Sequence, residues 1–267
     1  MKVAAIVPAA GSGLRMRGKV LKQFLLLDGL PILVHTLRVL DLASEIDEVI
    51  LVVPEPQVSF CRIEIVAKYR LKKVSKLIAG GERRQDSVYE GLRAASADAD
   101  WVMVHDGVRP FVTREMIQSA IETAKEAKDG AIVAIPMRDT PKEVSSDLPP
   151  GPAWPAGRQA GTITRTLDRQ RLWLAQTPQV FRRELFIKAH EAARSQGIYG
   201  TDDAALVERL GGSVRVVLGS EENIKVTTPM DLQLAEAIIK VRRKAGKVKV
   251  RTDRPGGRAD VRKKGAS

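Results

Sequence analysis

The sequence predicts an α/β fold in which a parallel sheet is covered by helices on both faces. Short runs of β-branched residues alternate with helix-length amphipathic segments along the chain, which is the pattern of strands joined by crossover helices. The 267 residues, 44% of them hydrophobic, are enough for one large domain with a sizeable core. The chain shows no internal repeat.

Six segments are expected to form the strands. They are residues 2–7, 48–53, 73–79, 101–106, 131–136 and 213–219. Between the fourth and fifth strands, apolar residues recur at helical spacing at Met116, Ile117, Ala120, Ile121 and Ala124. This spacing predicts a helix that packs one apolar stripe against the sheet, so we interpret these residues as core rather than as a cofactor site.

Residues 139–169 interrupt this alternation. The run SSDLPPGPAWPAGRQAG within them is rich in Pro and Gly, which disfavours regular structure. We therefore expect a protruding arm or a loop here. Trp154 lies within the run; it is most simply a packing contact, and the alternative is an anchor for a partner.

The net charge of +12 is concentrated at the C-terminal end. Residues 240–267 carry twelve Lys or Arg and two Asp, a net charge of +10, so the rest of the chain is nearly neutral. Residues 246–267 have few apolar side chains to bury, so we expect a disordered basic tail after a domain that spans residues 1–245. The tail is either passive and solvated or a weak contact for nucleic acid or another acidic surface.

A single cysteine, Cys61, excludes an intramolecular disulfide and any multi-cysteine metal site. A reducing compartment is therefore expected, and the cytoplasm is the default location. The apolar stretch 3–10 follows a lysine and imitates a signal-peptide core, but a strand followed by glycine fits it better. No apolar run approaches the ~20 residues that a membrane helix needs, so no membrane contact is expected.

The loop after the first strand has the composition of a phosphate-binding loop. Ligands of open sheets bind beyond the carboxyl ends of the strands. Gly11 and Gly13 let backbone N–H groups approach phosphate oxygens, and Arg15 and Lys22 supply positive charge. The dinucleotide fingerprint would need a glycine where Met16 stands, and the Walker sequence Gly-Lys-Ser/Thr does not occur. A nucleoside triphosphate fits the loop, although a solvated surface turn would look similar.

Two further strand ends carry polar residues. Gly80 and Gly81 follow the third strand and permit close backbone approach. Asp86 and Ser87 offer polar groups at the next helix start, which suits a base and a ribose. Asp106 follows the fourth strand, and a single carboxylate near a triphosphate is best explained as a Mg²⁺ ligand. The alternative for this aspartate is a turn or helix-capping residue.

The three histidines give no catalytic or metal site. His105 has no second His or Cys at metal-ligand spacing, and His35 and His190 lie within expected helices. No Ser-His-Asp or Cys-His arrangement can be built from these residues. We therefore interpret His105 as structural.

Seven sequence blocks resemble, in order, those of the 2-C-methyl-D-erythritol 4-phosphate cytidylyltransferase family. The blocks are PAAGSGLRM…KQF, GGERRQDSV, VHDGVRP, MRDTPK, LDRQRLWLAQTPQVF, TDDAALVE and NIKVTTPMDL. The resemblance covers residues 2–241 and implies a Rossmann-like fold of the glycosyltransferase-A, nucleotidyltransferase type with a β-arm. It also implies a Mg²⁺-dependent reaction of CTP with methylerythritol phosphate, on the non-mevalonate route to isoprenoids, and a homodimer joined through the arm.

The resemblance also assigns roles to individual residues. It gives Arg15 and Lys22 the central catalytic role at the triphosphate, and it also counts as catalytic Arg169 and Lys225, which would grip the acceptor. The nucleotide would be held by Ala9, Ala10, Gly11, Gly13, Gly81, Asp86 and Ser87. The acceptor would be held by Asp106, Arg109, Thr140, Arg169, Thr177, Thr201 and Lys225. Because the acceptor phosphate is already anionic, catalysis needs positioning and electrostatics rather than a general base. For Thr201, capping of the following helix is a sufficient alternative.

Three departures from the family pattern are visible. Leu21 stands where a proline usually precedes the catalytic lysine, and Gly107 and Val108 stand where alanines are usual. The arm also contains an insertion between Lys142 and Arg165. Two rival functions remain: a cytidylyltransferase that uses ribitol 5-phosphate, and a nucleotide- or RNA-binding protein without turnover.

Overall fold

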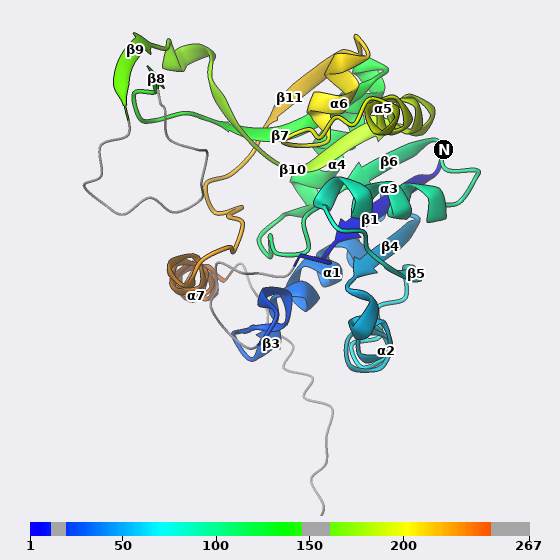
Figure 1. The fold of residues 1–267 in the computed structure, drawn as a ribbon. Helices are drawn as coiled ribbons and strands as arrows, with labels where there is room; N and C mark the ends of the chain where they lie inside the picture. The colour runs from blue at the N-terminus through cyan, green and yellow to red at the C-terminus, as the bar shows by residue number, and fades with distance from the viewer. Residues whose placement is uncertain (12–19, 146–160, 247–267) are drawn as a thin grey trace, which may run out of the picture.

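The computed structural model describes residues 1–11, 20–145 and 161–246. In these residues a central sheet is flanked by helices on both faces, and an arm extends to one side (Figure 1). The predictions for Trp154 and for the basic tail beyond Gly246 fall outside the described residues. No helix in the described part of the chain is long and apolar enough to cross a membrane.

The central sheet has seven strands in the order β11-β7-β10-β6-β1-β4-β5. They are β1 (Val3–Pro8), β4 (Glu48–Val53), β5 (Val74–Ala79), β6 (Trp101–Val104), β7 (Gly130–Pro136), β10 (Trp173–Arg182) and β11 (Val214–Leu218). The six predicted strands are confirmed, each within two residues of its expected ends. The strand order reverses next to β1, and such a switch point is where open α/β sheets bind ligands.

The seventh strand, β10, was not predicted, and it corrects the expectation of a parallel sheet. It pairs antiparallel with both β6 and β7. The chain leaves β7 at its carboxyl end, passes through the arm and enters β10 beside Pro136, where Trp173 is its register partner. The strand therefore runs against its neighbours and carries residues 176–179 past the carboxyl end of β6.

The core is double-sided because alternate residues of each strand point to opposite faces. One face of the sheet packs against α1 (Ile32–Leu42) and α4 (Arg114–Ala127). The other face packs against α3 (Arg84–Ala94), α5 (Arg183–Ser195) and α6 (Ala204–Arg209). Four residues of the predicted apolar stripe are buried in α4, and the fifth, Met116, is partly buried against the same core. Each fully buried Val, Leu or Ile side chain contributes about 1.5–3 kcal/mol, so the core fixes the strand ends that carry the site.

In a third apolar cluster, the C-terminal helix α7 (Pro229–Lys244) packs against the loop that follows β6. The helix begins with a capping box in which Thr228 and Asp231 satisfy each other's backbone N–H groups. Its buried Ala235 and Ile239 belong to the same cluster as Val108. Short elements complete the chain: η2 (Lys22–Phe24), β2 (Leu26–Leu27), β3 (Leu30–Pro31), η3 (Glu55–Gln57), α2 (Val58–Phe60), the π-helix η4 (Cys61–Ala67) and η5 (Arg169–Arg171).

The arm contains a two-stranded antiparallel hairpin. Its strands are β8 (Lys142–Ser145) and β9 (Thr162–Thr166), and every residue in them is exposed. Figure 1 shows the hairpin projecting away from the central sheet. The sequence prediction of a protruding β-arm is therefore confirmed for the described part of this segment.

Candidate active site

Three loops meet at the carboxyl ends of the parallel strands β1, β5 and β6. The N–H of Gly107 donates to the carbonyl of Pro8 at 3.3 Å, and the N–H of Gly80 donates to Val53 at 2.9 Å. A Cβ on Gly80 would lie 2.4 Å from the Cβ of Ala10, so only glycine permits this approach. The two loops that the sequence assigned to the nucleotide are therefore in contact.

Lys22 is held beside the first of these loops by its neighbour Gln23. Lys22 begins the short helix η2. The buried Gln23 side chain donates from Nε2 to the carbonyl of Ala9 at 2.7 Å. Gly13 and Arg15 lie in the segment 12–19, outside the described residues, so their predicted roles stay predictions.

The second loop leads directly into α3. Asp86 accepts a hydrogen bond from the N–H of Arg83 at 3.2 Å, which closes a capping box. The Ser87 hydroxyl is buried and donates to the carbonyl of Arg83 at 3.1 Å. These two hydrogen bonds restrain the backbone between Gly81 and the start of α3. The Ser87 side chain therefore has a structural role in addition to any contact with a nucleotide.

Asp106 lies just beyond β6, 5% exposed and among three cations. Arg84 donates from Nε to Oδ1 at 3.0 Å. Arg109 Nε and Lys225 Nζ lie 3.3 and 3.0 Å from Oδ2. Arg84 begins α3, Arg109 follows β6 and Lys225 precedes α7. Three segments that are distant in the sequence therefore converge on one carboxylate.

The three cations keep Asp106 ionised. Burial alone would raise the pKa of Asp106, but the positive charges of Arg84, Lys225 and Arg109 outweigh it and hold this pKa well below its ordinary value. Both carboxylate oxygens are engaged by cations. The described residues contain no group of three or more His, Cys, Asp or Glu that could hold a metal ion. In this arrangement Asp106 orients cations, and its predicted role as a Mg²⁺ ligand stays a prediction.

His105 and Thr177 support the backbone behind Asp106. The Thr177 hydroxyl accepts a hydrogen bond from the N–H of Asp106 at 3.1 Å and lies 3.0 Å from His105 Nδ1. His105 Nε2 lies 3.2 Å from the carbonyl oxygen of Arg109. A neutral His105 with its proton on Nε2 satisfies all of these contacts, and burial favours that form by lowering the pKa of His105 to about 4. The structural interpretation of His105 fits this geometry, and Thr177, 3% exposed, lies beneath the site.

Thr201 lies on the exposed surface just before α6. The N-cap residue of α6 is Asp203, and Asp202 accepts a hydrogen bond from the N–H of Ala205 at 3.0 Å. Thr201 therefore does not cap this helix, so that alternative is wrong. The segment reaches the site through Asp203, whose Oδ2 lies 2.8 Å from Arg84 Nη1.

Thr140 and Arg169 lie at the base of the arm. Thr140 is exposed in the loop before β8. Arg169 begins η5, and its Nη1 donates to the carbonyl of Arg138 at 2.9 Å. Within the described residues, no hydrogen bond or ion pair joins either of them to Asp106. These two residues therefore lie outside the ion-pair cluster around Asp106.

Sequence reasoning missed three buried amide side chains under the site. Asn223 donates from Nδ2 to Gln176 Oε1 at 3.1 Å and to the carbonyl of Thr177 at 2.9 Å. Gln179 donates from Nε2 to Asp202 at 2.9 Å. A signal was present, because Gln176 and Gln179 flank Thr177 in a strand-like run and buried polar side chains need partners.

Sequence reasoning also missed Arg84. Burial would lower the pKa of Arg84, but the charges of Asp203 and Asp106 raise it above its ordinary value, so the guanidinium stays charged. The block GGERRQDSV contains this residue, but an arginine at a helix start gives no sign of burial, since arginine is usually exposed.

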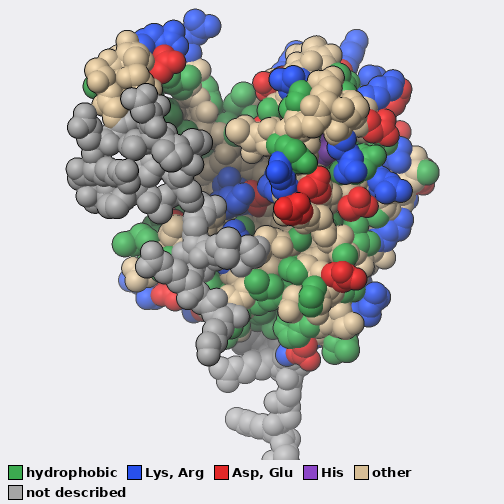
Figure 2. Space-filling model, viewed as in Figure 1, with side chains coloured by type: hydrophobic (Ala, Val, Ile, Leu, Met, Phe, Trp, Pro, Cys, Tyr) green, Lys and Arg blue, Asp and Glu red, His purple; other side chains and the backbone are tan. Residues whose placement is uncertain are grey.

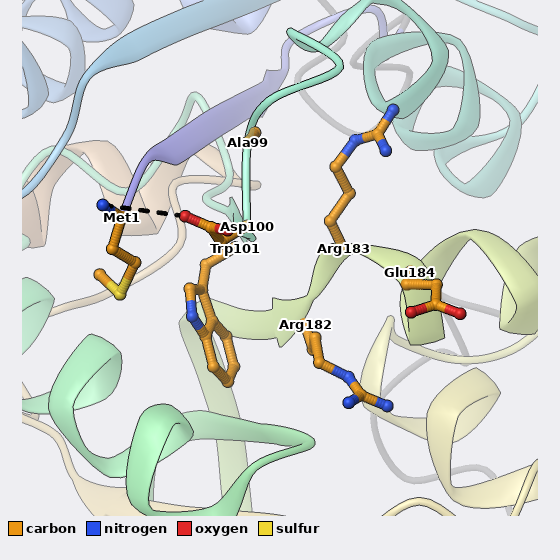
Figure 3. A pocket seen from close by; sticks show the side chains of 7 residues that line it. All are labelled: Met1, Ala99, Asp100, Trp101, Arg182, Arg183 and Glu184. Atoms are coloured by element: carbon orange, nitrogen blue, oxygen red, sulfur yellow. Dashed lines mark ion pairs between the residues drawn. The ribbon is translucent and has the colours of Figure 1, made fainter.

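A cavity of about 600 Å³ lies elsewhere, at the amino ends of the strands (Figure 3). Its walls include Trp101 and Glu184, and the N-terminal amine of Met1 lies 3.9 Å from Asp100 at its edge. This position is opposite the strand ends at which α/β sheets bind ligands, so size alone does not make it the active site. Figure 2 shows instead a deep notch between the arm and the body of the molecule, with Lys and Arg side chains at its base.

The strand order and the charged site at the carboxyl ends of the strands occur in a chain whose structural neighbours are nucleotidyltransferases. It is similar to the crystal structure of 4-diphosphocytidyl-2C-methyl-D-erythritol synthase from Anaerococcus prevotii, with a TM-score of 0.76, 30% identity and coverage of 90% of this chain and 96% of the other. The structure of 2-C-methyl-D-erythritol 4-phosphate cytidylyltransferase from Thermus thermophilus gives a TM-score of 0.69, 32% identity and coverage of 90% and 100%.

Sequence comparison defines the family. The family model for 2-C-methyl-D-erythritol 4-phosphate cytidylyltransferase matches residues 3–241. The enzyme of that name from Geotalea uraniireducens is 48% identical over 242 residues, which cover 90% of this chain and 97% of the relative. The Syntrophus aciditrophicus enzyme is 49% identical over 239 residues, with 90% and 96% coverage. The chain belongs to the 2-C-methyl-D-erythritol 4-phosphate cytidylyltransferase family and is a nucleotidyltransferase, as the sequence blocks predicted.

Proposed function

We propose that this protein transfers the cytidylyl group of CTP to 2-C-methyl-D-erythritol 4-phosphate, in isoprenoid precursor biosynthesis. A phosphate oxygen of the acceptor forms a bond to the α-phosphorus of CTP, and the bond from that phosphorus to the oxygen bridging to the β-phosphorus breaks. The products are pyrophosphate and 4-diphosphocytidyl-2-C-methyl-D-erythritol. The observation that carries the proposal is the cationic cluster around Asp106 at the carboxyl end of the sheet, in a chain of this family.

The nucleotide side of the site is built from backbone and from Lys22. The loops that carry Ala10 and Gly80 lie in contact, and their backbone groups are proposed to line the site of the pyrimidine base. Gln23 fixes the carbonyl of Ala9 and so sets the position of Lys22. From there the ammonium group would stabilise the charge that develops on the α-phosphoryl oxygens, and Arg15 is proposed to share this role.

The acceptor side is built on the Asp106 cluster. Arg84, Arg109 and Lys225 carry three positive charges against the two negative charges of Asp106 and Asp203. Asp202 adds a further negative charge near Asp203, so the preference for an anionic acceptor rests on the positions of Arg109 and Lys225 rather than on a net charge. A phosphate that paired with Arg109 and Lys225 would gain charge-assisted hydrogen bonds, and no general base is needed because the phosphate is already ionised.

We propose that Mg²⁺ enters the site on the triphosphate rather than on a preformed protein site. Both oxygens of Asp106 are engaged by cations, and Mg²⁺ is often held largely by substrate phosphates. Bound there, the ion would supply charge neutralisation on the triphosphate oxygens. Activity that persists after exhaustive chelation would contradict this requirement.

We also propose a homodimer that brings the arm of one subunit to the site of the other. Thr140 and Arg169 are predicted to hold the acceptor, yet they are exposed at the base of the arm. Ile163 of the arm and Trp173 beside it are 58% and 43% exposed, and apolar side chains of this kind suit a protein interface. For the location we propose the cytoplasm, which is compatible with the single, buried Cys61.

Pyrophosphate release tests the proposed function. Purified protein with Mg²⁺ is given each of the four nucleoside triphosphates, together with methylerythritol 4-phosphate or ribitol 5-phosphate. We expect efficient release only with CTP and methylerythritol phosphate. Faster turnover of ribitol 5-phosphate would favour that related cytidylyltransferase, and no release from any pair by a folded, metal-supplied sample would favour a binding protein.

A further inference from the structure

Arg84 links the two halves of the site through a single guanidinium group. Its Nε donates to Asp106 Oδ1 at 3.0 Å, and its Nη1 lies 2.8 Å from Asp203 Oδ2. The two carboxylates are 5% and 1% exposed. Asp106 follows β6, and Asp203 directly precedes α6 in the segment that carries Thr201.

Neighbouring contacts join the same two segments. Gln85 donates from Nε2 to the carbonyl of Ile198 at 3.0 Å and accepts from the N–H of Gly200 at 2.9 Å. The Arg83 guanidinium lies 3.6 Å from the centre of the Tyr199 ring. The start of α3, which borders the nucleotide loop, is thus fastened to residues 198–203 at three consecutive positions.

We propose that Arg84 is a positioning residue that sets Asp106 and the 201–203 segment against the nucleotide loop. This inference rests on the proposed function and deepens it. Arg84 does not need to touch either substrate. It acts by fixing the carboxylate that orients Arg109 and Lys225, and by fixing the segment that presents Thr201 to the acceptor.

The shape of the guanidinium group is what this role requires. Its planar, rigid group carries Nε and Nη1 in a fixed relation, so one side chain donates a hydrogen bond to Asp106 and at the same time holds an ion pair with Asp203 on a different segment. A lysine would keep the charge, but its single ammonium group could not occupy the positions of both Nε and Nη1. It would bind one carboxylate or lie between the two. Asp106 would then interact mainly with Arg109 and Lys225 and would draw their cations away from the acceptor phosphate.

The variant R84K tests this geometry, because it preserves charge and removes the planar group. We expect R84K to raise the KM for methylerythritol phosphate and to lower kcat, with a combined loss of about 10- to 100-fold in kcat/KM for the acceptor, as small misplacements of reacting groups cause. The KM for CTP should change less than about threefold, because the contact between the two nucleotide loops, at Ala10 and Gly80, does not involve the Arg84 side chain. The matched control is R93K on the same helix, where Arg93 is 66% exposed and pairs only loosely with Glu90, at 3.7 Å.

Two further variants separate positioning from stability. R84A is assayed with added guanidinium ions, which should restore part of the acceptor turnover, while ammonium ions at the same ionic strength should not. D203N removes one end of the link, and its effect on acceptor kcat/KM should not add to that of R84K, since both break the same connection. If R84A fails to fold, R84K and D203N still decide the question.

The outcomes are distinguishable. Wild-type turnover with unchanged KM values in R84K, and only a lower melting temperature, would show a purely structural role and would overturn the proposal. Equal increases in both KM values would also overturn it, because the acceptor side would not be selectively affected. A wild-type protein without turnover of CTP and methylerythritol phosphate would refute the proposed function itself, and this role with it.

Discussion

Replacing Asp106 with Asn keeps the shape of the side chain and removes the charge that three cations surround. Removing one partner of a buried ion pair costs about 3–5 kcal/mol. The side chains of Arg84 and Lys225 are 31% and 34% exposed, and solvent screens their repulsion, so we take the lower end, about 3 kcal/mol. A domain of similar size loses about 2–4 °C in melting temperature per kcal/mol. D106N should therefore melt about 6–12 °C below the wild type.

Thermal unfolding followed by circular dichroism at neutral pH measures this difference. The control is D98N, which makes the same chemical change in an exposed pair, where Asp98 is 72% exposed and 3.0 Å from Lys2. That variant should melt close to the wild type, because solvent screens an exposed ion pair. The reasoning on the Asp106 cluster would be refuted if D106N melted at the same temperature as D98N. Loss of stability in D106N should be accompanied by a higher KM for methylerythritol phosphate, because Arg109 and Lys225 lose the carboxylate that orients them.

Three further predictions follow from single residues. K22A should lower turnover by about 10²- to 10³-fold, as loss of one preorganised charge at the reacting group does, with little change in melting temperature; more than a tenth of wild-type kcat at saturating substrates would contradict this role. His190 is buried against Phe186 with no hydrogen-bond partner for its ring nitrogens among the described residues, and burial, with the nearby charges of Arg84 and Arg194, lowers its pKa to about 4. Because the unfolded chain then binds more protons, the free energy of unfolding should fall as the pH falls from about 6.5 to 4, by about 2 kcal/mol at pH 5. In urea titrations at several pH values, H190F should show a smaller fall than the wild type; an equal fall in both proteins would contradict this prediction. L21P should stabilise the fold by about 0.4–1 kcal/mol, because Leu21 already has a φ of −62°, which proline requires. A large drop in the urea midpoint would contradict this and would show that the N–H of residue 21 is needed.

Most of the sheet could be predicted from the sequence because its strands are local, apolar and β-branched. The strand β10 could not, since Pro178 and two glutamines interrupt the strand-forming residues of 173–182, and a proline within a run argues against a central strand. Its antiparallel direction depends on where the arm returns the chain to the sheet, which is a long-range property. The apolar stripe of α4 was predictable for the opposite reason, because periodicity within one helix is a local signal.

The candidate site shows the same division. Lys22, Asp106 and the Gly80–Gly81 turn could be identified because each follows a strand end, and strand ends meet at one edge of the sheet. The roles of Arg84 and Asn223 could not be predicted, since their partners lie 22 to 119 and 46 to 47 positions away in the chain. Whether a polar residue is buried and paired depends on that tertiary packing, and no pattern within the blocks GGERRQDSV and NIKVTTPMDL records it.

The most direct test of the central claim follows the phosphate oxygens of the acceptor. Methylerythritol 4-phosphate labelled with ¹⁸O in its phosphate is incubated with CTP, Mg²⁺ and the protein, and the products are separated and examined by ³¹P NMR and mass spectrometry. Attack of the acceptor phosphate on the α-phosphorus predicts a cytidine diphosphate ester with ¹⁸O in its bridging position, and unlabelled pyrophosphate. Label in the pyrophosphate, or no diphosphate ester at all, would contradict the account.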